Sequence, residues 1–338
     1  MKGIIFPAPN SFKIEEMPDP AIAAPDDVLV RIRAGGICGS DMHCYHGTSA
    51  FARYPLIPGH EVSAEVVELG QAAQGLETGD HVVLDPVNSC GKCYPCLTGR
   101  YNVCVDLKAN GAHTQGAFSE FAVFKRHKLH RISKAISWEH AAVVEPYTIA
   151  AQSIFRGRIQ ADDTVLIMGA GPIAMVILQA SKMLGAKCIV SDISARRLER
   201  ARQLGADYTF TAGQIGIRNF LEKHPELPGI TLALDATGAP SVLPEIIANM
   251  LPTGRVVTLG FSAKTTEIQQ LEITKRELDI MGSRLSCGQF PKVVEWVEKK
   301  LVDPSKIITH IFHFEEFGQA ISLFDNKPDE CCKIVLTF

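Results

Sequence analysis

The chain has 338 residues, more than one hydrophobic core ordinarily holds, so its length predicts two domains. Hydrophobic residues make up 46% and charged residues 21% of the chain, which is typical of a globular enzyme and excludes a disordered protein. The net charge of −3 offers no electrostatic basis for binding nucleic acid or an anionic membrane, and we expect neither as a partner.

The N-terminal residues give no indication of export. Pro7 and Pro9 interrupt the apolar stretch that a signal peptide would need. The uncharged run at residues 164–181 contains GAGP, which fits a buried strand, turn and helix better than a membrane-spanning helix. We therefore expect a cytoplasmic protein whose ten cysteines stay reduced.

The first part of the chain, to about residue 145, has the pattern of β-structure with irregular loops. Residues 27–37 and 61–70 alternate apolar and polar side chains, as half-buried strands do, and residues 79–86 and 117–124 add two shorter candidates. The basic segment KRHKLHR at residues 125–131 is interpreted as a solvated edge of this region rather than a nucleic-acid patch.

The pattern changes after Pro146, where predicted strands alternate with predicted helices. The predicted strands are residues 164–169, 187–192, 230–236, 254–260 and 278–283, and the predicted helices include residues 172–184, 194–206 and 291–301. A last strand closes the chain at residues 331–338. Such alternation indicates a parallel, doubly wound sheet, so we predict an α/β fold with a β-rich first domain.

The segment GAGPIA at residues 169–174 has the dinucleotide-binding form G-x-G-x-x-G/A. It follows a predicted strand and opens a predicted helix. Gly169 and Gly171 would permit a tight turn and a close approach of a pyrophosphate, beside Pro172 and Ile173 at the helix N-terminus. An ordinary strand–helix unit with a glycine turn is the competing interpretation.

Asp192 ends the next predicted strand after this motif. A carboxylate at that place accepts hydrogen bonds from a ribose diol and repels a 2′-phosphate, which predicts NAD as the cofactor. Arg196 and Arg197 follow closely and keep NADP open as an alternative.

Four of the ten cysteines are clustered with the spacing C-x2-C-x2-C-x7-C: Cys90, Cys93, Cys96 and Cys104. Four thiolates suit tetrahedral zinc, and a site without an open ligand position is structural. An iron–sulfur cluster is the competitor, but such clusters use other spacings. We predict a structural zinc lobe at about residues 88–106.

A second group of metal-binding residue types is scattered through the first domain. GICGSDMH supplies Cys38 together with Ser40 and His43, and IPGHEV supplies His60 and Glu61. A thiolate, an imidazole and a carboxylate with one open position would make a catalytic zinc site. Taken singly, each residue also fits a small buried side chain or a loop position.

Glu145 stands in the apolar run AAVVEPYTIA. An ionised carboxylate among apolar residues is costly unless a cation or hydrogen-bond donors meet it. We therefore predict that Glu145 lies near the same metal.

Together these residues resemble the zinc-containing medium-chain dehydrogenase family, on its polyol, sorbitol-like side. GICGSDMH, GHE, the four-cysteine lobe, VEP, GAGP and Asp192 occur in the family's order, and the match covers essentially the whole chain. The resemblance implies a GroES-like catalytic domain at residues 1–146, a Rossmann domain at residues 147–284, and a C-terminal segment at residues 285–338 that returns to the catalytic domain. It also implies two zinc ions per chain and a homodimer or homotetramer.

The same resemblance suggests roles for individual residues. The polyol branch has glutamate where the alcohol branch has a third zinc-binding cysteine, as Glu145 does here. In that branch Glu61 can also bind the zinc while Glu145 holds the zinc water, and which carboxylate is the direct ligand stays open. The resemblance further implies that Ser40 takes the substrate proton and passes it through the cofactor ribose towards His43, and that Arg197 helps to hold NAD.

Further segments (SCGKCYPC, EPYTIAA, GSRLS and CCKIVLTF) resemble the starvation-sensing branch, which is similar to L-galactonate and L-gulonate 5-dehydrogenases. The implied reaction is NAD-dependent oxidation of an L-gulonate-, L-galactonate- or L-mannonate-like hexonate at its 5-position. The arginine–tyrosine pair that sorbitol dehydrogenase has after its last Rossmann strand is absent here, and Arg284 lies one position earlier. Arg284 would bind the carboxylate of the substrate. The alternative is an arginine at the surface or at a subunit interface. His113 is the other substrate candidate, with an ordinary loop histidine as its competitor.

Two rival functions remain at this stage. One is a polyol, threonine or alcohol dehydrogenase of the same fold. The other is a zinc- and NAD-binding regulatory protein without catalysis, which the presence of all the candidate zinc ligands disfavours.

Overall fold

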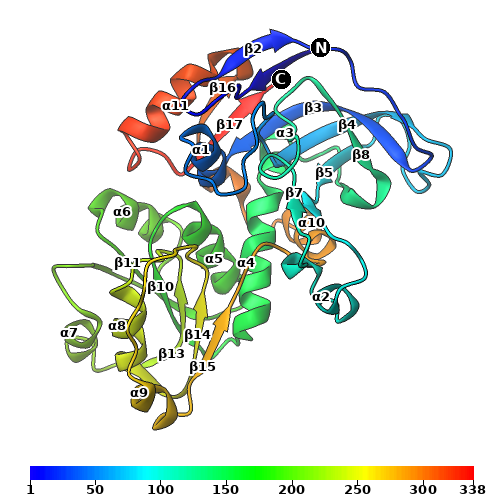
Figure 1. Ribbon diagram of the computed structural model, residues 1–338. Coiled ribbons are helices and arrows are strands. Elements are labelled where there is room, and N and C mark those ends of the chain that lie inside the picture. The colour runs from blue at the N-terminus through cyan, green and yellow to red at the C-terminus, as the bar shows by residue number, and fades with distance from the viewer. The chain divides into compact units, whose positions relative to one another are not determined.

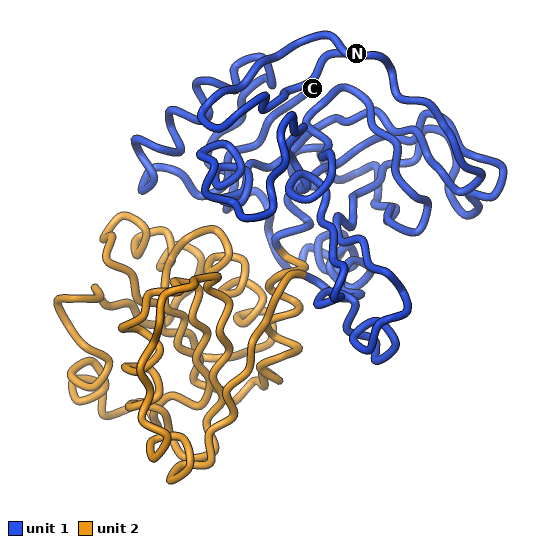
Figure 2. The backbone as a smooth tube through the Cα atoms, viewed as in Figure 1, with its two compact units in different colours: residues 1–146, 286–338 blue, residues 147–285 orange.

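The computed structural model describes residues 1–338 (Figure 1). The chain divides into two compact units: unit 1 is Met1–Pro146 with Ser286–Phe338, and unit 2 is Tyr147–Leu285 (Figure 2). None of the helices combines the length and the apolar character needed to cross a membrane.

Unit 1 is built mainly of short strands. Its strands are β1 (Lys2–Ile5), β2 (Lys13–Glu16), β3 (Asp27–Ile37), β4 (Glu61–Leu69), β5 (His81–Leu84), β6 (Val87–Asn88), β7 (Lys108–Ala109), β8 (Phe121–Lys125), β9 (Leu129–Arg131), β16 (Ile308–His313) and β17 (Lys333–Thr337). Its helices are α1 (Gly39–Tyr45), α2 (Tyr94–Leu97), α3 (Trp138–Ala142), α10 (Phe290–Glu298) and α11 (Phe317–Asn326), with 3-10 turns η1 (Tyr101–Val103), η2 (Arg126–Lys128), η3 (Pro304–Lys306) and η4 (Phe314–Glu316).

The long strand β3 organises the main sheet of unit 1. The strand order is β16-β17-β3-β4-β5-β9, and β8 also pairs with β3. The apolar side chains that alternate along β3, such as Val28, Val30 and Ile32, are fully buried. Strand β17, from the C-terminus, pairs antiparallel with β3 and sets Ile334 opposite Ile37, so the last strand of the chain completes the sheet of the first domain.

Unit 2 is a six-stranded parallel sheet in the order β12-β11-β10-β13-β14-β15, the doubly wound order of a Rossmann fold. Its strands are β10 (Thr164–Met168), β11 (Lys187–Asp192), β12 (Tyr208–Thr211), β13 (Ile230–Asp235), β14 (Met250–Thr258) and β15 (Asp279–Gly282). Its helices are α5 (Pro172–Met183), α6 (Ala195–Gln203), α7 (Ile217–Glu222), α8 (Val242–Asn249) and α9 (Gln270–Thr274), and α4 (Val144–Gly157) leads the chain into it.

The structure confirms the predicted α/β class with a parallel, doubly wound sheet. Strand β10 is buried at every position, as its wholly apolar sequence predicts for a central parallel strand. The prediction missed the short helices α1 and α3, and it missed that the apolar run around Glu145 enters helix α4. Helices as short as α1 have too few turns to show a periodic apolar pattern.

Candidate active site and metal sites

The structure brings three of the predicted catalytic ligands together in unit 1. Cys38 follows β3 and precedes α1, while His60 and Glu61 stand at the start of β4. The pairing of Gly36 with Glu61 aligns these two strand ends. As a result, one ligand atom from each of Cys38, His60 and Glu61 lies within 4.8 Å of the others.

Glu61 shows that this set fits a metal ion. Its side chain is fully buried, and its Oε2 atom has no hydrogen-bond partner. A buried carboxylate oxygen without a partner is costly, and a cation beside it would remove that cost. Sulfur, nitrogen and oxygen donors with no fourth protein ligand in the set match the donors of a catalytic zinc site with an open position.

Lys333 is a member of this site that the sequence analysis missed. Its side chain is buried, and its Nζ donates to Glu61 Oε1 at 2.7 Å and to the carbonyl oxygen of Ile37 at 3.2 Å. Burial alone would lower the pKa of Lys333, but Glu61, together with Cys38 and Glu145, outweighs burial and raises that pKa. The lysine is therefore a buried cation against the ligand set.

Asp41 is a second residue that the sequence analysis passed over. Its carboxylate accepts from the backbone N–H of Cys38 at 2.9 Å and of Gly59 at 3.0 Å, and its Oδ1 lies 3.5 Å from His60 Nδ1. Burial would lower the pKa of His60, but Asp41 and then Cys38 outweigh it and raise that pKa. A carboxylate on the far nitrogen of a metal-binding imidazole fixes the orientation of the ring, which is the part we assign to Asp41.

Glu145 lies in the first turn of α4 and is buried. Burial raises the pKa of Glu145 to about 7, while His60 and Lys333 act in the opposite direction. Its carboxylate is not among the atoms gathered within 4.8 Å. The structure thus groups Glu61, and not Glu145, with Cys38 and His60.

Ser40 and His43 lie on α1 and are exposed. Ser40 Oγ is 3.5 Å from His60 Nε2, and His43 Nδ1 is 2.9 Å from Thr48 Oγ1. A hydroxyl that lies next to the ligand set and is also open to solvent can receive a proton there and release it outwards.

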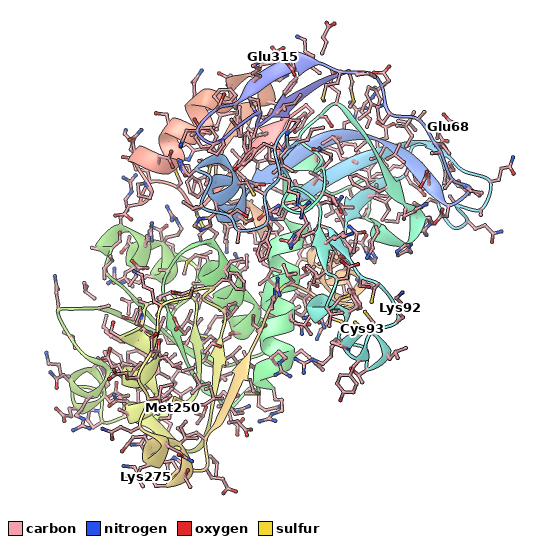
Figure 3. The ribbon with its side chains drawn as sticks, viewed as in Figure 1. Glu68, Lys92, Cys93, Met250, Lys275 and Glu315 are labelled. Carbon is pink, nitrogen blue, oxygen red and sulfur yellow. The ribbon has the colours of Figure 1, made fainter.

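The four cysteines of the predicted lobe also converge. Cys90, Cys93, Cys96 and Cys104 present sulfur atoms that all lie within 4.8 Å of one another, and none forms a disulfide. Backbone N–H groups of Val105 and Cys96 lower the pKa of Cys93 to about 6, which favours the thiolate form that binds zinc. The lobe is formed around α2, and Figure 3 labels Cys93 and Lys92 there.

The glycine motif of unit 2 forms the expected turn. Gly169 has φ +96°, a conformation that favours glycine, and Gly171 caps α5 just before Pro172 and Ile173. Asp192 Oδ2 accepts from the backbone N–H of Ala170 at 2.7 Å, which ties the end of β11 to this turn.

Asp192 and the start of α6 are similarly linked. Asp192 Oδ1 accepts from Ser194 N at 2.8 Å, and the Ser194 hydroxyl caps α6 by accepting from Arg197 N. Arg197 therefore stands in the first turn of the helix that follows Asp192, and the helix N-termini provide N–H donors suited to phosphate.

The two predicted substrate residues lie outside these sets. His113 stacks on Phe51 with ring centroids 4.5 Å apart, and its Nδ1 accepts from Ala109 N at 3.3 Å. In unit 2, the Arg284 guanidinium lies 5.4 Å from the centre of the Phe261 ring. Neither residue belongs to a group of candidate metal ligands.

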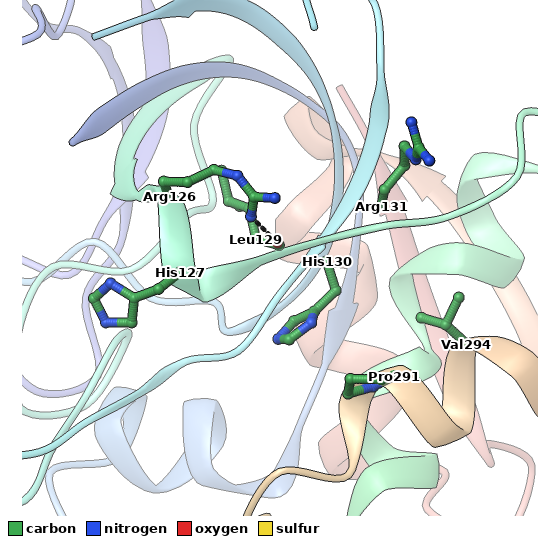
Figure 4. A pocket seen from close by; sticks show the side chains of 7 residues that line it. All are labelled: Arg126, His127, Leu129, His130, Arg131, Pro291 and Val294. Carbon is green, nitrogen blue, oxygen red and sulfur yellow. Dashed lines mark hydrogen bonds between the residues drawn. The ribbon is translucent and has the colours of Figure 1, made fainter. Parts of the chain in front are cut away.

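Five residues of the basic segment line a cavity of about 330 Å³ in unit 1, together with Pro291 and Val294 of α10 (Figure 4): Arg126, His127, Leu129, His130 and Arg131. The Arg126 guanidinium is held by the carbonyl oxygens of Gln74, Leu129 and Gly75. The cavity shares no residue with the ligand sets, so it is not the candidate active site.

The chain matches two family models: an alcohol dehydrogenase GroES-like domain at residues 24–134 and a zinc-binding dehydrogenase domain at residues 172–299. It is 40% identical to the starvation-sensing protein RspB of Escherichia coli K12, over 100% of this chain and 99% of that protein. It is 29% identical to a sorbitol dehydrogenase of Bacillus subtilis, over 99% and 97% of the two chains. It is 27% identical to a 2-dehydro-3-deoxy-L-galactonate 5-dehydrogenase of Pseudoalteromonas atlantica, over 90% of each.

Among solved structures, RspB of Escherichia coli CFT073 in complex with NADH superposes with a TM-score of 0.94 at 39% identity, covering 100% of this chain and 99% of that one. Zinc and a nicotinamide dinucleotide are the cofactors typical of proteins with these domains. These matches confirm the predicted family and the predicted GroES-like and Rossmann-type architecture. The chain thus belongs to the zinc-binding dehydrogenases and is an oxidoreductase that acts on a small-molecule substrate.

Proposed function

We propose that this dehydrogenase oxidises the secondary alcohol at the 5-position of a hexonate, such as an L-gulonate, L-galactonate or L-mannonate, with NAD⁺ as hydride acceptor. The observation that carries the chemistry is the convergence of Cys38, His60 and the buried Glu61, which together offer one sulfur, one nitrogen and one oxygen ligand. Glu145 would then face the metal's water rather than bind the metal.

Zinc bound by Cys38, His60 and Glu61 would act as a Lewis acid on the substrate hydroxyl. The residues of the chain supply position and proton transfer. Ser40 Oγ, next to His60, would accept the substrate proton, and the exposed His43 on the same helix would carry it to solvent. The glycine turn and Asp192 of unit 2 would hold NAD, which would supply the redox chemistry as hydride acceptor.

Arg284 and one relative support an acidic substrate. An arginine binds a carboxylate through the edge of its guanidinium, and the Arg284 guanidinium lies over the Phe261 ring, 5.4 Å from its centre. The relative named 2-dehydro-3-deoxy-L-galactonate 5-dehydrogenase acts, by its name, on a sugar acid at the 5-position. A polyol substrate is the second candidate, since a sorbitol dehydrogenase has a similar level of identity.

An NAD⁺-reduction screen with added zinc would test this proposal. Hexonates, pentonates, polyols and L-threonine would be compared for wild type and for Arg284→Gln. We expect the highest kcat/KM with a hexonate, and a drop of roughly 10- to 100-fold for the variant on acids only, the size of one charge-assisted pair. Activity with sorbitol and none with any sugar acid would refute the hexonate assignment.

We further propose that the protein works in the cytoplasm as a homodimer or homotetramer. None of the ten cysteines forms a disulfide, as in a reducing compartment. Three large apolar side chains, Tyr94, Leu97 and Val105, are at least 73% exposed on the four-cysteine lobe, which favours contact with a second copy. Light scattering after size-exclusion chromatography would give the mass, and a monomer would contradict this part of the proposal.

A further inference from the structure

Lys333 is held rigidly at the ligand set by backbone pairing on both sides of its strand. Strand β17 pairs with β16 on one side and with β3 on the other, and Lys333 N donates to Ile307 O at 2.9 Å. Its side chain is only 2% exposed, like the apolar Ile334 beside it. A buried lysine in such a strand has little freedom to leave its partner.

That partner, Glu61, is engaged unequally at its two oxygens. Lys333 occupies Oε1 at 2.7 Å, whereas Oε2 is buried and has no protein partner. Oε2 packs against Gly36, where an added Cβ would lie 2.2 Å from it. Because Gly36 has no side chain, Oε2 has room in its present position. The Lys333 ammonium occupies the space next to Oε1.

We infer that Lys333 is a positioning residue that restricts Glu61 to one metal-binding oxygen and so keeps a position at the metal open for the substrate. The inference rests on the proposed metal-dependent alcohol oxidation, in which Cys38 and His60 complete the ligand set. The positive charge of Lys333 also offsets the negative charge of Glu61, so the ligand set presents a smaller net negative charge to the metal. Without the lysine, both oxygens of Glu61 become available to the ion.

The experiment replaces zinc with Co²⁺ in the full-length protein and compares wild type, Lys333→Met and Lys333→Arg by visible absorption. Four-coordinate Co²⁺ absorbs more strongly than ions with more ligands, so the spectrum reports coordination directly. We expect the Met variant to keep its metal but to show weaker bands. Turnover should fall by roughly 10- to 100-fold, as for other residues that orient a metal ligand. The Arg variant should restore the wild-type spectrum, because it keeps the cation.

Lys128→Met is the matched control. Lys128 is also a buried lysine of unit 1, but it donates to Val87 O and lies 3.8 Å from Asp85. Its loss should reduce stability without changing the spectrum. The four-cysteine lobe contributes equally to every variant, so difference spectra isolate the Glu61 site.

A folded Lys333→Met protein with a wild-type spectrum would overturn the inference, and so would loss of the metal, because the lysine is proposed to restrict a ligand rather than to retain the ion. If the Met variant does not fold, Lys333→Gln tests the same point with a neutral hydrogen-bond donor. The spectrum needs no substrate. A wild-type protein that oxidises no hexonate would refute the proposed function and leave this test intact.

Discussion

The two candidate metal sites of unit 1 are built in opposite ways. The cysteines of the lobe come from one short segment, are chemically identical and are mostly half-buried at the surface. The set of Cys38, His60 and Glu61 mixes three donor types, includes a fully buried carboxylate, and depends on the last strand of the chain for Lys333. The site proposed to stabilise is therefore local, whereas the site proposed to react depends on the sheet around it.

The difference also appears in how charge is balanced. In the lobe, backbone N–H groups stabilise the sulfur atoms, as between Cys90 N and Cys104 Sγ at 3.2 Å. At the set of Cys38, His60 and Glu61, charged side chains balance the charge: Asp41 faces His60 and Lys333 faces Glu61. Backbone donors fix a geometry, while buried charges also tune the reactivity of a metal.

The largest effect that separates the two sites should come from Cys38→Ser. If Cys38 binds the metal, as proposed, its loss would remove the reactive ion, so we expect turnover to fall by more than roughly 100-fold, beyond the usual cost of losing an orienting neighbour. Binding of NADH, measured by fluorescence, should be unchanged because Cys38 lies outside unit 2. Cys331→Ser, a buried cysteine outside both sets, is the control. An undiminished turnover rate would refute the assignment of Cys38 as a metal ligand.

Cys93→Ser should act on stability before it acts on catalysis. Opening a four-thiolate site releases the metal that holds the lobe together, and we expect the unfolding temperature to fall by roughly 10 °C or more in a calorimetric scan. Lys92→Ser changes the exposed neighbour and should leave the scan unchanged. A purely kinetic defect with full thermal stability would contradict a structural metal at Cys93.

The same contrast explains what could be predicted from the sequence. The four-cysteine spacing and GAGPIA are local patterns, so the sequence alone locates the lobe and the glycine turn. Lys333 and Glu61 are 272 positions apart, and only the pairing of β17 with β3 brings them together. The clue was nevertheless present: a lysine in the apolar CCKIVLTF poses the same problem of buried charge as Glu145 in its own apolar run.

Asp41 was missed for a different reason. In the sequence it is one acid in GICGSDMH and fits a helix-capping role, which the structure also shows through its bond to Cys38 N. That it also faces His60 follows from the return of the chain to β4, which no local pattern encodes. The roles assigned to the site residues stay predictions, those of the metal ligands and of Asp192 as well as those of Ser40, His43, His113 and Arg284.

In unit 2, Asp192→Asn would show how far cofactor choice depends on one carboxylate. Removing the negative charge should weaken NAD⁺ binding roughly tenfold and reduce the preference for NAD⁺ over NADP⁺. The ratio of the KM values for the two cofactors measures this preference. Asparagine keeps an oxygen for Ala170 N or Ser194 N, so the turn should survive. Asp207→Asn is the control, since this carboxylate also accepts a backbone N–H, from Cys188. An unchanged KM ratio would remove Asp192 from the cofactor site.

The smallest effect is expected from Glu65, which lies on β4 like Glu61 but pairs with Arg33 at a site where both side chains are about one-third exposed. The hydrogen bond from Arg33 lowers the pKa of Glu65 below its ordinary value of 4.5. A lowered pKa means that the pair stabilises the fold above pH 4.5, and that this contribution is lost as the pH falls through the folded-state pKa.

Glu65→Gln should therefore lower the free energy of unfolding at pH 7 by less than about 1 kcal/mol, because solvent screens a pair whose side chains are about one-third exposed. The difference from wild type should shrink steadily below pH 4.5 in urea titrations. Glu68→Gln is the control on the same strand, since Glu68 is exposed; Figure 3 labels this residue. A pH-independent difference would mean that Glu65 stabilises by packing, and that charge matters on β4 only where it is buried against Lys333.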